Sequence, residues 1–276
     1  MHSLVRALHH RVKDPVRVDS YYAPLALALH GRLVKPRPRA FVVGIQGPQG
    51  CGKSTLAAAL VDALADIGHP GVALSIDDFY LTRAEQVALA GRHPGNPYME
   101  HRGYPGTHDV PLGSRMLAAL VGLGAGETLR LPIYDKSAHG GRGDRAPAAS
   151  FRSVEGPKDL VILEGWMLGF RKVLDTELPD ARLQAPNACL DGYAAWTSHL
   201  DMFVQLDVEG TDSIVRWRVD AERARRQQGL TGLSDEDARD YIQRFLPAYE
   251  TYVPRLRDTP PCEDVVVIHL SPTRNP

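Results

Sequence analysis

The sequence predicts an α/β fold with a mostly parallel sheet covered by helices on both faces. Five short apolar runs have the length and composition of buried strands: 41–45, 72–76, 160–165, 202–208 and 265–270. Segments with helical spacing of apolar residues separate these runs, and such alternation favours a parallel sheet. A glycine-rich turn, residues 47–54, follows the first run, and its motif is a further indication of the fold class.

Residues 1–40 are predicted to form an N-terminal helical extension. Apolar and basic positions recur at roughly helical spacing over 1–34, and the proline-broken segment 35–39 then leads into the first strand. The pattern is compatible with packing on the sheet edge, with a dimer contact or with a cover over the site. The oligomeric state is left open.

Residues 41–276 are predicted to form the main domain. Its first helix has apolar residues at a period near 3.6, namely Leu56, Leu60, Leu64 and Ile67, and it ends before Gly68 and Pro70. The short apolar runs listed above continue the alternation toward the C-terminus.

Two long segments depart from that alternation. Residues 83–158 are rich in Gly, Pro and His, and only 111–123, with Asp109 as a cap, reads as a helix. Long irregular segments in compact domains are usually functional, so a substrate loop is predicted there. Residues 212–258 are predicted to form a helical lid of two helices, the second beginning at the capping pattern of 234–237.

Composition and charge exclude several classes of function. The 32 basic and 33 acidic residues nearly cancel, which argues against a nucleic-acid or anionic-membrane partner. The chain has neither a signal-peptide pattern nor an apolar run of roughly 18 residues. Its three cysteines form no CxxC pattern or disulfide framework. A cytoplasmic location with no membrane partner is the expectation.

The glycine-rich turn predicts a nucleotide site. Residues 47–54 satisfy G-x-x-x-x-G-K-S/T, with a strand before and a helix after, so backbone N–H groups and the helix N-terminus can cradle phosphates. Lys53 can reach the β- and γ-phosphates, and Ser54 can bind Mg²⁺. The pattern indicates a P-loop NTPase-type three-layer sandwich with ATP and Mg²⁺ as cofactors. The predicted nucleotide-binding residues are Gly47, Pro48, Gln49, Gly50, Cys51, Gly52, Lys53, Ser54 and Thr55.

Two carboxylates are expected at the ends of strands that face this turn. Asp77 follows the run 72–76, and Glu164 lies near the end of the run 160–165. Ligands bind outside the carboxyl ends of strands in such sheets. Phosphoryl transfer needs a base for the acceptor hydroxyl and oxygen ligands for the metal, so Asp77 is the candidate base and Ser54, Asp77 and Glu164 are candidate metal ligands. A turn or cap role for Asp77 is the alternative.

Several motifs together resemble the plant-type D-glycerate 3-kinase family. That family is part of the superfamily that includes uridine kinase, phosphoribulokinase and bacterial pantothenate kinase. The resemblance covers roughly residues 40–276 and rests on SIDDFYLT (75–82), EHRGYPGTHDVPLG (100–113), LPIYDKSAHGGRGDR (131–145), LEGWMLGF (163–170), SDEDARDYIQRFLPAYETYVPRL (234–256), the P-loop segment 44–57 and the terminal SPTRNP.

The resemblance implies phosphorylation of the 3-hydroxyl of D-glycerate by ATP and Mg²⁺, with an aspartate at the position of Asp77 as the base. A kinase of the same superfamily acting on pantothenate, a nucleoside or another sugar-like alcohol is the alternative. A nucleotide-dependent regulatory ATPase is a third hypothesis, and it predicts slow hydrolysis without stimulation by any small alcohol.

A small hydroxy acid needs cations and hydrogen-bond donors in its pocket. Within the two loop motifs, cations are expected from Arg102, His108, Lys136, Arg142 and Arg145. Aromatic walls are expected from Tyr80 and Tyr134, with Tyr104 as a further candidate, and Asp135 is expected to hold a hydroxyl or orient a cation. Any one of these residues has a purely structural role as its alternative.

The lid should supply an arginine to the transferred phosphoryl group. Arg216, Arg218 and Arg223 lie on the helix after the fourth strand, and Arg216 is the candidate catalytic residue. The alternative for these arginines is a solvent-exposed basic helix in which ion pairs neutralise their charges. Arg274 and Asn275, just past the last strand, are weaker candidates for contacts to adenine.

Overall fold

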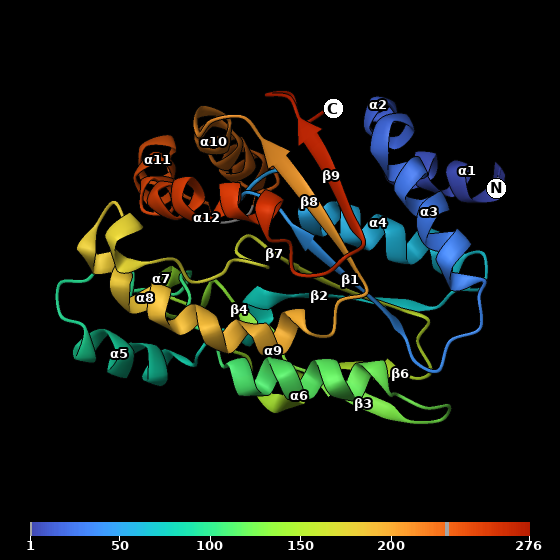
Figure 1. Cartoon of the computed structure of the whole chain (residues 1–276), viewed down its shortest axis with the longest axis horizontal. Helices are drawn as coiled ribbons and strands as arrows, with labels where there is room; N and C mark the ends of the chain where they lie inside the picture. Colours follow the sequence, from blue (N-terminus) through green and yellow to red (C-terminus); the bar gives the residue numbers. More distant parts are fainter. Residues whose placement is uncertain (1, 230–231) are drawn as a thin grey trace.

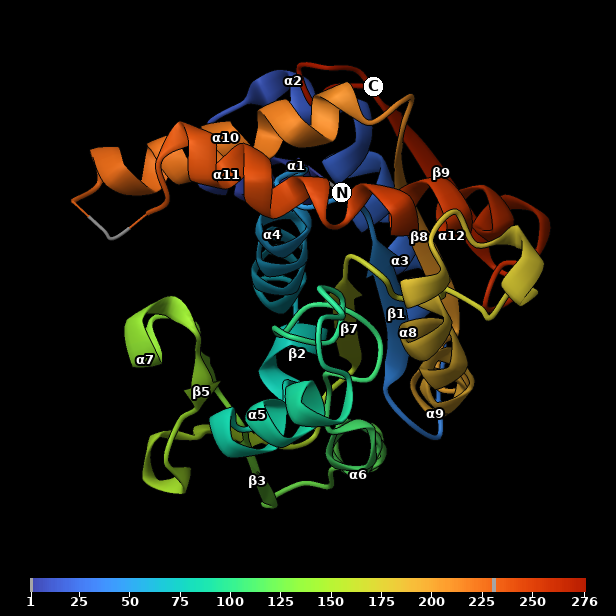
Figure 2. The same cartoon turned by 90° about the vertical axis from the view of Figure 1, so that its left-hand side faces the viewer.

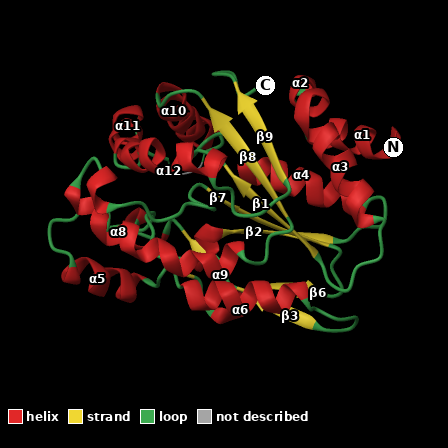
Figure 3. Cartoon of the chain, in the orientation of Figure 1, coloured by secondary structure: helices red, strands yellow, loops and turns green. Residues whose placement is uncertain are grey.

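A computed structural model describes residues 2–229 and 232–276. Its central sheet has five parallel strands in the order β2-β7-β1-β8-β9 (Figures 1 and 3). The strands are β1 (Phe41–Gln46), β2 (Gly71–Ser75), β7 (Leu160–Gly165), β8 (Met202–Val208) and β9 (Val265–Leu270). The predicted α/β class with a parallel sheet is therefore confirmed.

One strand boundary differs from the prediction. β2 begins at Gly71 and ends at Ser75, and Ile76 opens a 3₁₀ turn over Ile76–Phe79. The Ser75 hydroxyl accepts a hydrogen bond from the Asp77 N–H at 3.3 Å, so a serine cap turns the chain one residue early. Asp77 thus lies in the turn after the strand, at the carboxyl edge of the sheet.

The N-terminal residues form one helical layer together with the helix after the P-loop. This layer contains α1 (His2–Arg11), α2 (Pro15–Arg17), a π-helical turn (Val18–Tyr22), α3 (Ala23–Leu33) and α4 (Lys53–Ala65). Leu4, Leu8 and Leu29 share a buried core with Leu56 and Leu60 of α4. Figure 1 shows α1 and α3 beside α4. The N-terminal helices therefore pack on α4, a position that the sequence did not indicate.

A second core covers the opposite face of the sheet. It is built around aromatic side chains, among them Trp166, Trp196, Phe203 and Phe245. The helices packed there are α6 (Val110–Val121), α8 (Gln184–Cys189), α9 (Ala194–Thr197) and α12 (Leu246–Asp258), and short 3₁₀ turns lie at Asp175–Glu177, Ala181–Leu183 and Leu190–Tyr193. Helices on both faces complete the predicted three-layer arrangement.

The segment 83–158 is more regular than expected. It contains α5 (Arg83–Arg92) and α6, together with α7 (Ala138–Gly141), a 3₁₀ turn (Ala148–Ser150) and two antiparallel pairs: β3 (Thr128–Leu131) with β6 (Arg152–Glu155), and β4 (Tyr134–Asp135) with β5 (Asp144–Arg145). The prediction of a single helix there was wrong. Thr82 and Glu85 form a reciprocal capping box that starts α5. The predicted cap of α6 by Asp109 is confirmed.

The segment 212–258 contains three helices, and the prediction of two was wrong. They are α10 (Asp212–Gln227), α11 (Asp235–Gln243) and α12. Ser234 caps α11 as predicted, accepting the Asp237 N–H at 3.0 Å. Pro247 lies in the first turn of α12, where the missing N–H costs nothing, so a new helix starts there. Figure 2 shows α10 and α11 on one side of the molecule and α5, α7 and β5 on the other.

Within the described residues, no helix combines the length and the apolar composition needed to cross a bilayer.

Candidate active site

The P-loop between β1 and α4 depends on two glycines in the left-handed region. Gly50 has a φ of +83° and Gly52 a φ of +104°. A Cβ on Gly50 would lie 2.7 Å from the Trp217 carbonyl oxygen of α10, so a side chain is excluded there by space as well as by conformation. The loop is therefore held in its phosphate-binding shape by close packing on α10.

Replacing Gly50 with alanine is expected to weaken ATP binding about tenfold or more and to lower the melting temperature. The added methyl group must displace either the loop or Trp217, and left-handed alanine is strained. Calorimetric titration with ATP and thermal unfolding would measure both effects. Gly31→Ala serves as control, because nothing lies within 4 Å of a Cβ placed there. Unchanged ATP affinity in Gly50→Ala would contradict a loop held rigid by this contact.

The functional groups of the P-loop lie where the motif predicts. Lys53 is buried at the start of α4, and its Nζ donates to the Pro48 carbonyl at 3.0 Å. The Ser54 hydroxyl donates to Oε1 of Glu164 at 2.7 Å, which joins the loop to the end of β7. Thr55 is exposed in the same first turn of the helix. Burial raises the pKa of the Cys51 thiol, so Cys51 packs as a small apolar residue inside the loop.

The pair of Ser54 and Glu164 fits a magnesium ion. Mg²⁺ is usually held by one or two protein oxygens, with phosphate and water oxygens filling the remaining positions. Hydroxyl and carboxylate oxygens already meet beside the P-loop. Across the described residues, no group of three or more His, Cys, Asp and Glu side chains forms a metal cage. The donor set is thus of the kind that shares a metal with a bound nucleotide.

Asp77 and Lys136 form an ion pair next to this site. Ser75 and Glu164 are register partners on the neighbouring strands β2 and β7, so Asp77 lies one strand away from Glu164. The Lys136 Nζ is 2.6 Å from Oδ2 of Asp77. Burial alone would raise the pKa of Asp77, but the Lys136 ammonium outweighs burial and holds it at about 2. Asp77 is therefore ionised at neutral pH and can accept a proton or a hydrogen bond.

Aromatic rings form a wall beside Asp77. Tyr80 stacks on His108 with ring centroids 4.4 Å apart and meets Tyr134 edge-on at 5.2 Å. Nδ1 of His108 lies 2.8 Å from the Tyr193 hydroxyl, and that hydroxyl accepts the Gly106 N–H, so its own proton is free for Nδ1. Nε2 of His108 is buried and has no partner among the described residues.

His108 corrects one expectation. Burial lowers the pKa of His108 to about 4, with Asp77 opposing the shift only partly. At neutral pH the side chain is an uncharged hydrogen-bonding group, and the prediction that it supplies a positive charge was wrong. A sequence shows a histidine but not the desolvation that removes its proton.

Two of the arginines predicted to bind the substrate donate hydrogen bonds to backbone carbonyl oxygens instead. Arg102 donates to the carbonyls of Gly141, Arg142 and Lys136 and lies over the Tyr134 ring at 5.5 Å. Arg145 donates to the Tyr80 carbonyl at 3.0 Å and to Oδ2 of Asp109 at 3.2 Å. Both side chains shape the loops that carry Tyr80 and Lys136.

The other two predicted loop residues lie on the surface. Arg142 is exposed, with its guanidinium 2.9 Å from Nδ1 of His101. Asp135 is exposed and accepts the Ser137 N–H at 2.8 Å, which closes the turn after β4. The structure thus brings Lys136, Tyr80, Tyr134 and His108 to Asp77, and it does not bring Arg142 or Asp135 there.

The lid arginines differ in their partners. Arg218 pairs with Glu222 and lies over the Tyr241 ring at 4.5 Å. Arg223 pairs with Asp235 at the start of α11. Arg216 is exposed and makes no hydrogen bond or ion pair with any residue that the structure describes. Of the three, Arg216 is the one whose guanidinium is unpaired among the described residues, and its contact with a phosphoryl group remains a prediction.

Two contacts to the P-loop escaped sequence reasoning. The Tyr249 hydroxyl on α12 accepts the Gln49 N–H at 3.0 Å. Arg274 donates through Nε to the Gly50 carbonyl at 2.9 Å and lies over the Trp217 ring. Both residues are far from the loop in sequence, and the motifs that contain them do not show that they contact it. The predicted adenine contacts of Arg274 and Asn275 remain a prediction.

Comparison with known proteins adds independent information. No established family profile matches the chain. The chain is 37% identical to the chloroplastic D-glycerate 3-kinase of Arabidopsis thaliana, over 96% of this chain but only 62% of the plant protein. It is also 37% identical to an uncharacterized kinase of Schizosaccharomyces pombe, over 86% of this chain and 87% of that protein. The solved structure of D-glycerate 3-kinase from Cryptococcus neoformans matches with a TM-score of 0.79 at 30% identity, covering 95% and 97% of the two chains.

Proposed function

Because this chain belongs to the D-glycerate 3-kinase family, we propose that it transfers the γ-phosphoryl group of ATP to the 3-hydroxyl of D-glycerate. The ion pair of Asp77 and Lys136 beside the P-loop carries the proposal. A hydroxy acid needs one group that attracts its carboxylate and another that accepts its hydroxyl proton, and this pair supplies both. Residues 41–276 form the catalytic domain in this proposal.

Each residue of the site has a separate role in the proposed phosphoryl transfer. The backbone N–H groups of the P-loop and Lys53 hold the phosphates and stabilise charge on the transferred group. Asp77 orients the acceptor hydroxyl and takes its proton as the acceptor oxygen bonds to phosphorus and the bond to the ADP oxygen breaks. Lys136 attracts the substrate carboxylate. As that carboxylate draws the ammonium away, Asp77 becomes a stronger base.

Magnesium fits the same arrangement. Ser54 and Glu164 would hold it, and when bound it would neutralise charge on the β- and γ-phosphates. Asp77 is engaged by Lys136 in the free protein, so we assign it to the acceptor hydroxyl first and to the metal only as a second role.

Replacing Lys136 with methionine is expected to raise KM for D-glycerate about tenfold to a hundredfold. The same change should move the acidic limb of kcat/KM upward in pH. Activity falls when Asp77 is protonated. Without Lys136, burial is opposed only by the smaller effects of His108 and of the Tyr80 hydrogen bond, so the pKa of Asp77 should rise from about 2 to above its ordinary value of 3.8. Rates measured from about pH 3.5 to about pH 8.5 test this.

Lys172→Met is the matched control for that experiment. Lys172 is a half-exposed lysine whose nearest carboxylate, Asp191, is 3.8 Å away. Its removal should leave both KM and the pH profile unchanged. An unaltered KM and an unaltered acidic limb in Lys136→Met would remove Lys136 from the acceptor site.

The proposed activity is tested by phosphate transfer from ATP and Mg²⁺ to D-glycerate, L-glycerate, pantothenate and uridine, with the product identified by phosphorus NMR. Transfer to the 3-hydroxyl of D-glycerate alone is the expected result. Transfer to pantothenate or uridine instead would favour the alternative kinases of the superfamily. ATP binding without transfer to any alcohol would favour the regulatory ATPase.

A further inference from the structure

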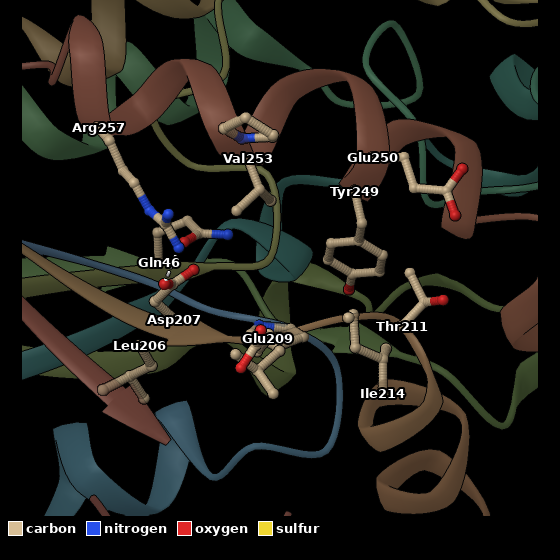
Figure 4. Close-up of a pocket in the computed structure, with 14 residues that line it drawn as sticks. Gln46, Leu206, Asp207, Glu209, Thr211, Ile214, Tyr249, Glu250, Val253 and Arg257 are labelled. Carbon is tan, nitrogen blue, oxygen red and sulfur yellow. Dashed lines mark hydrogen bonds and ion pairs between the residues drawn. The ribbon is translucent and has the colours of Figure 1, made fainter. Parts of the chain in front are cut away.

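A cavity of about 250 Å³ lies between α12 and the carboxyl end of β8, next to the P-loop. Val253 and Arg257 of α12 project toward Asp207 and Gln46 in Figure 4, and the loop around Glu209 closes one end. A cavity of about 150 Å³ accommodates benzene, so this one has room for a single-ring compound. Lys53, Ser54, Asp77 and Glu164 do not line it.

Two buried polar atoms in its lining have no partner among the described residues. They are Oε1 of Gln46 and Oδ1 of Asp207, in side chains that are 1% and 2% exposed. The other oxygen of Asp207 is engaged by Arg257 and by His269 at 3.0 Å. Buried polar atoms are nearly always hydrogen-bonded, and both of these are acceptors. A ligand group that reaches either oxygen from the cavity would be the donor of that hydrogen bond.

The remaining residues that line the cavity indicate the charge and the apolar part of a suitable ligand. Asp207 and the exposed Glu209 and Glu250 contribute three carboxylates against the single guanidinium of Arg257. Val208, Ile214, Val253 and Pro254 supply apolar walls. We propose that this cavity is a second ligand site, selective for a small organic cation with an apolar ring or alkyl body and an amine or amidine head.

The site adjoins the P-loop without overlapping its phosphate cradle. Gln46 and Pro48 lie where β1 enters the loop, and Tyr249, which accepts the Gln49 N–H, lines the cavity as well. A ligand there contacts residues that hold the loop, so ligand and nucleotide bind together and alter each other's affinity reciprocally. The proposal concerns binding and does not depend on the identity of the phosphate acceptor.

The experiment uses benzylamine as the probe, with benzyl alcohol and phenylacetate as ligands of similar size but different charge. Protein-observed NMR titration of the full chain is expected to give saturable binding of benzylamine near about 1 mM, a typical affinity for so small a ligand. Benzyl alcohol should bind at least about tenfold more weakly and phenylacetate not at all. Saturating ADP and Mg²⁺ should leave the benzylamine site accessible.

Two variants locate the binding. Val253→Trp fills the cavity without removing a charge and should abolish benzylamine binding, whereas Val34→Trp, at a valine that is 58% exposed, should not. Asp207→Asn should weaken benzylamine at least about tenfold. If that variant fails to fold, Val253→Trp decides alone. The proposal is overturned if benzylamine does not bind, if it binds no better than phenylacetate, if ADP displaces it completely, or if Val253→Trp binds it normally.

Discussion

Replacing Asp77 with asparagine is expected to lower kcat by about 10²-fold or more while ATP affinity stays close to that of the unaltered protein. Asparagine matches aspartate in size but cannot take the hydroxyl proton, and it leaves the Lys136 ammonium without its carboxylate at 2.6 Å. ATP affinity is preserved because Asp77 lies in the turn after β2, outside the P-loop. Steady-state rates with D-glycerate and calorimetric titration with ATP separate the two effects.

The neighbouring carboxylate offers a matched control. Asp78 accepts the Ser75 N–H at 3.4 Å, and an asparagine oxygen can accept the same hydrogen bond. Asp78→Asn should therefore retain most of the activity. Equal losses in the two variants would indicate that the turn, and not the Asp77 carboxylate, supports catalysis. Full activity in Asp77→Asn would remove Asp77 from the proton-transfer step.

The sheet and the phosphate site could be predicted because each rests on a local signal. β7, β8 and β9 are predominantly apolar runs, and their bounds match the expected ones. The P-loop motif can be identified locally because its glycines adopt left-handed φ values, +83° at Gly50 and +104° at Gly52, that other residues rarely adopt. Since strand ends in a parallel sheet meet at one edge, the positions of Asp77 and Glu164 follow from the strand assignment alone.

Helices with weak apolar periodicity were missed for a physical reason. α5 buries only Gln86 and Leu89, so its sequence has little amphipathic pattern, and its start is marked only by the capping box of Thr82 and Glu85. The break between α11 and α12 was missed because apolar spacing continues across it. In both cases the end signals, a cap and a first-turn proline, were more informative than the pattern.

The roles of individual cations could not be read from the sequence. Arg102, Arg145 and Lys136 all lie in polar loops. Arg102 and Arg145 donate hydrogen bonds to backbone carbonyl oxygens, whereas Lys136 forms an ion pair with Asp77. Which partner a cation meets depends on how distant segments fold together, and so does the burial that keeps His108 neutral. Residue type therefore limits the candidates, and tertiary contacts select among them.

Tertiary contacts also distinguish Arg216, because they leave it unpaired while Arg218 and Arg223 form ion pairs. Replacing Arg216 with alanine is expected to lower kcat about 10³-fold. A positioned arginine that neutralises charge on the transferred phosphoryl group contributes roughly 10³ to 10⁵ in rate. Arg216 is exposed on α10, in a hollow that this helix shares with α11, and no described residue forms a hydrogen bond or an ion pair with its guanidinium.

Arg223→Ala is the control that separates charge at the site from charge on the helix. Arg223 lies on the same helix but is paired with Asp235, so its loss should change kcat only a few-fold. KM for ATP should move little in Arg216→Ala, because the contact strengthens as charge develops on the transferred group. Similar rates in the two variants would mean that α10 is a solvated basic helix, and that Lys53 and the loop amides stabilise the phosphoryl group without help from the lid.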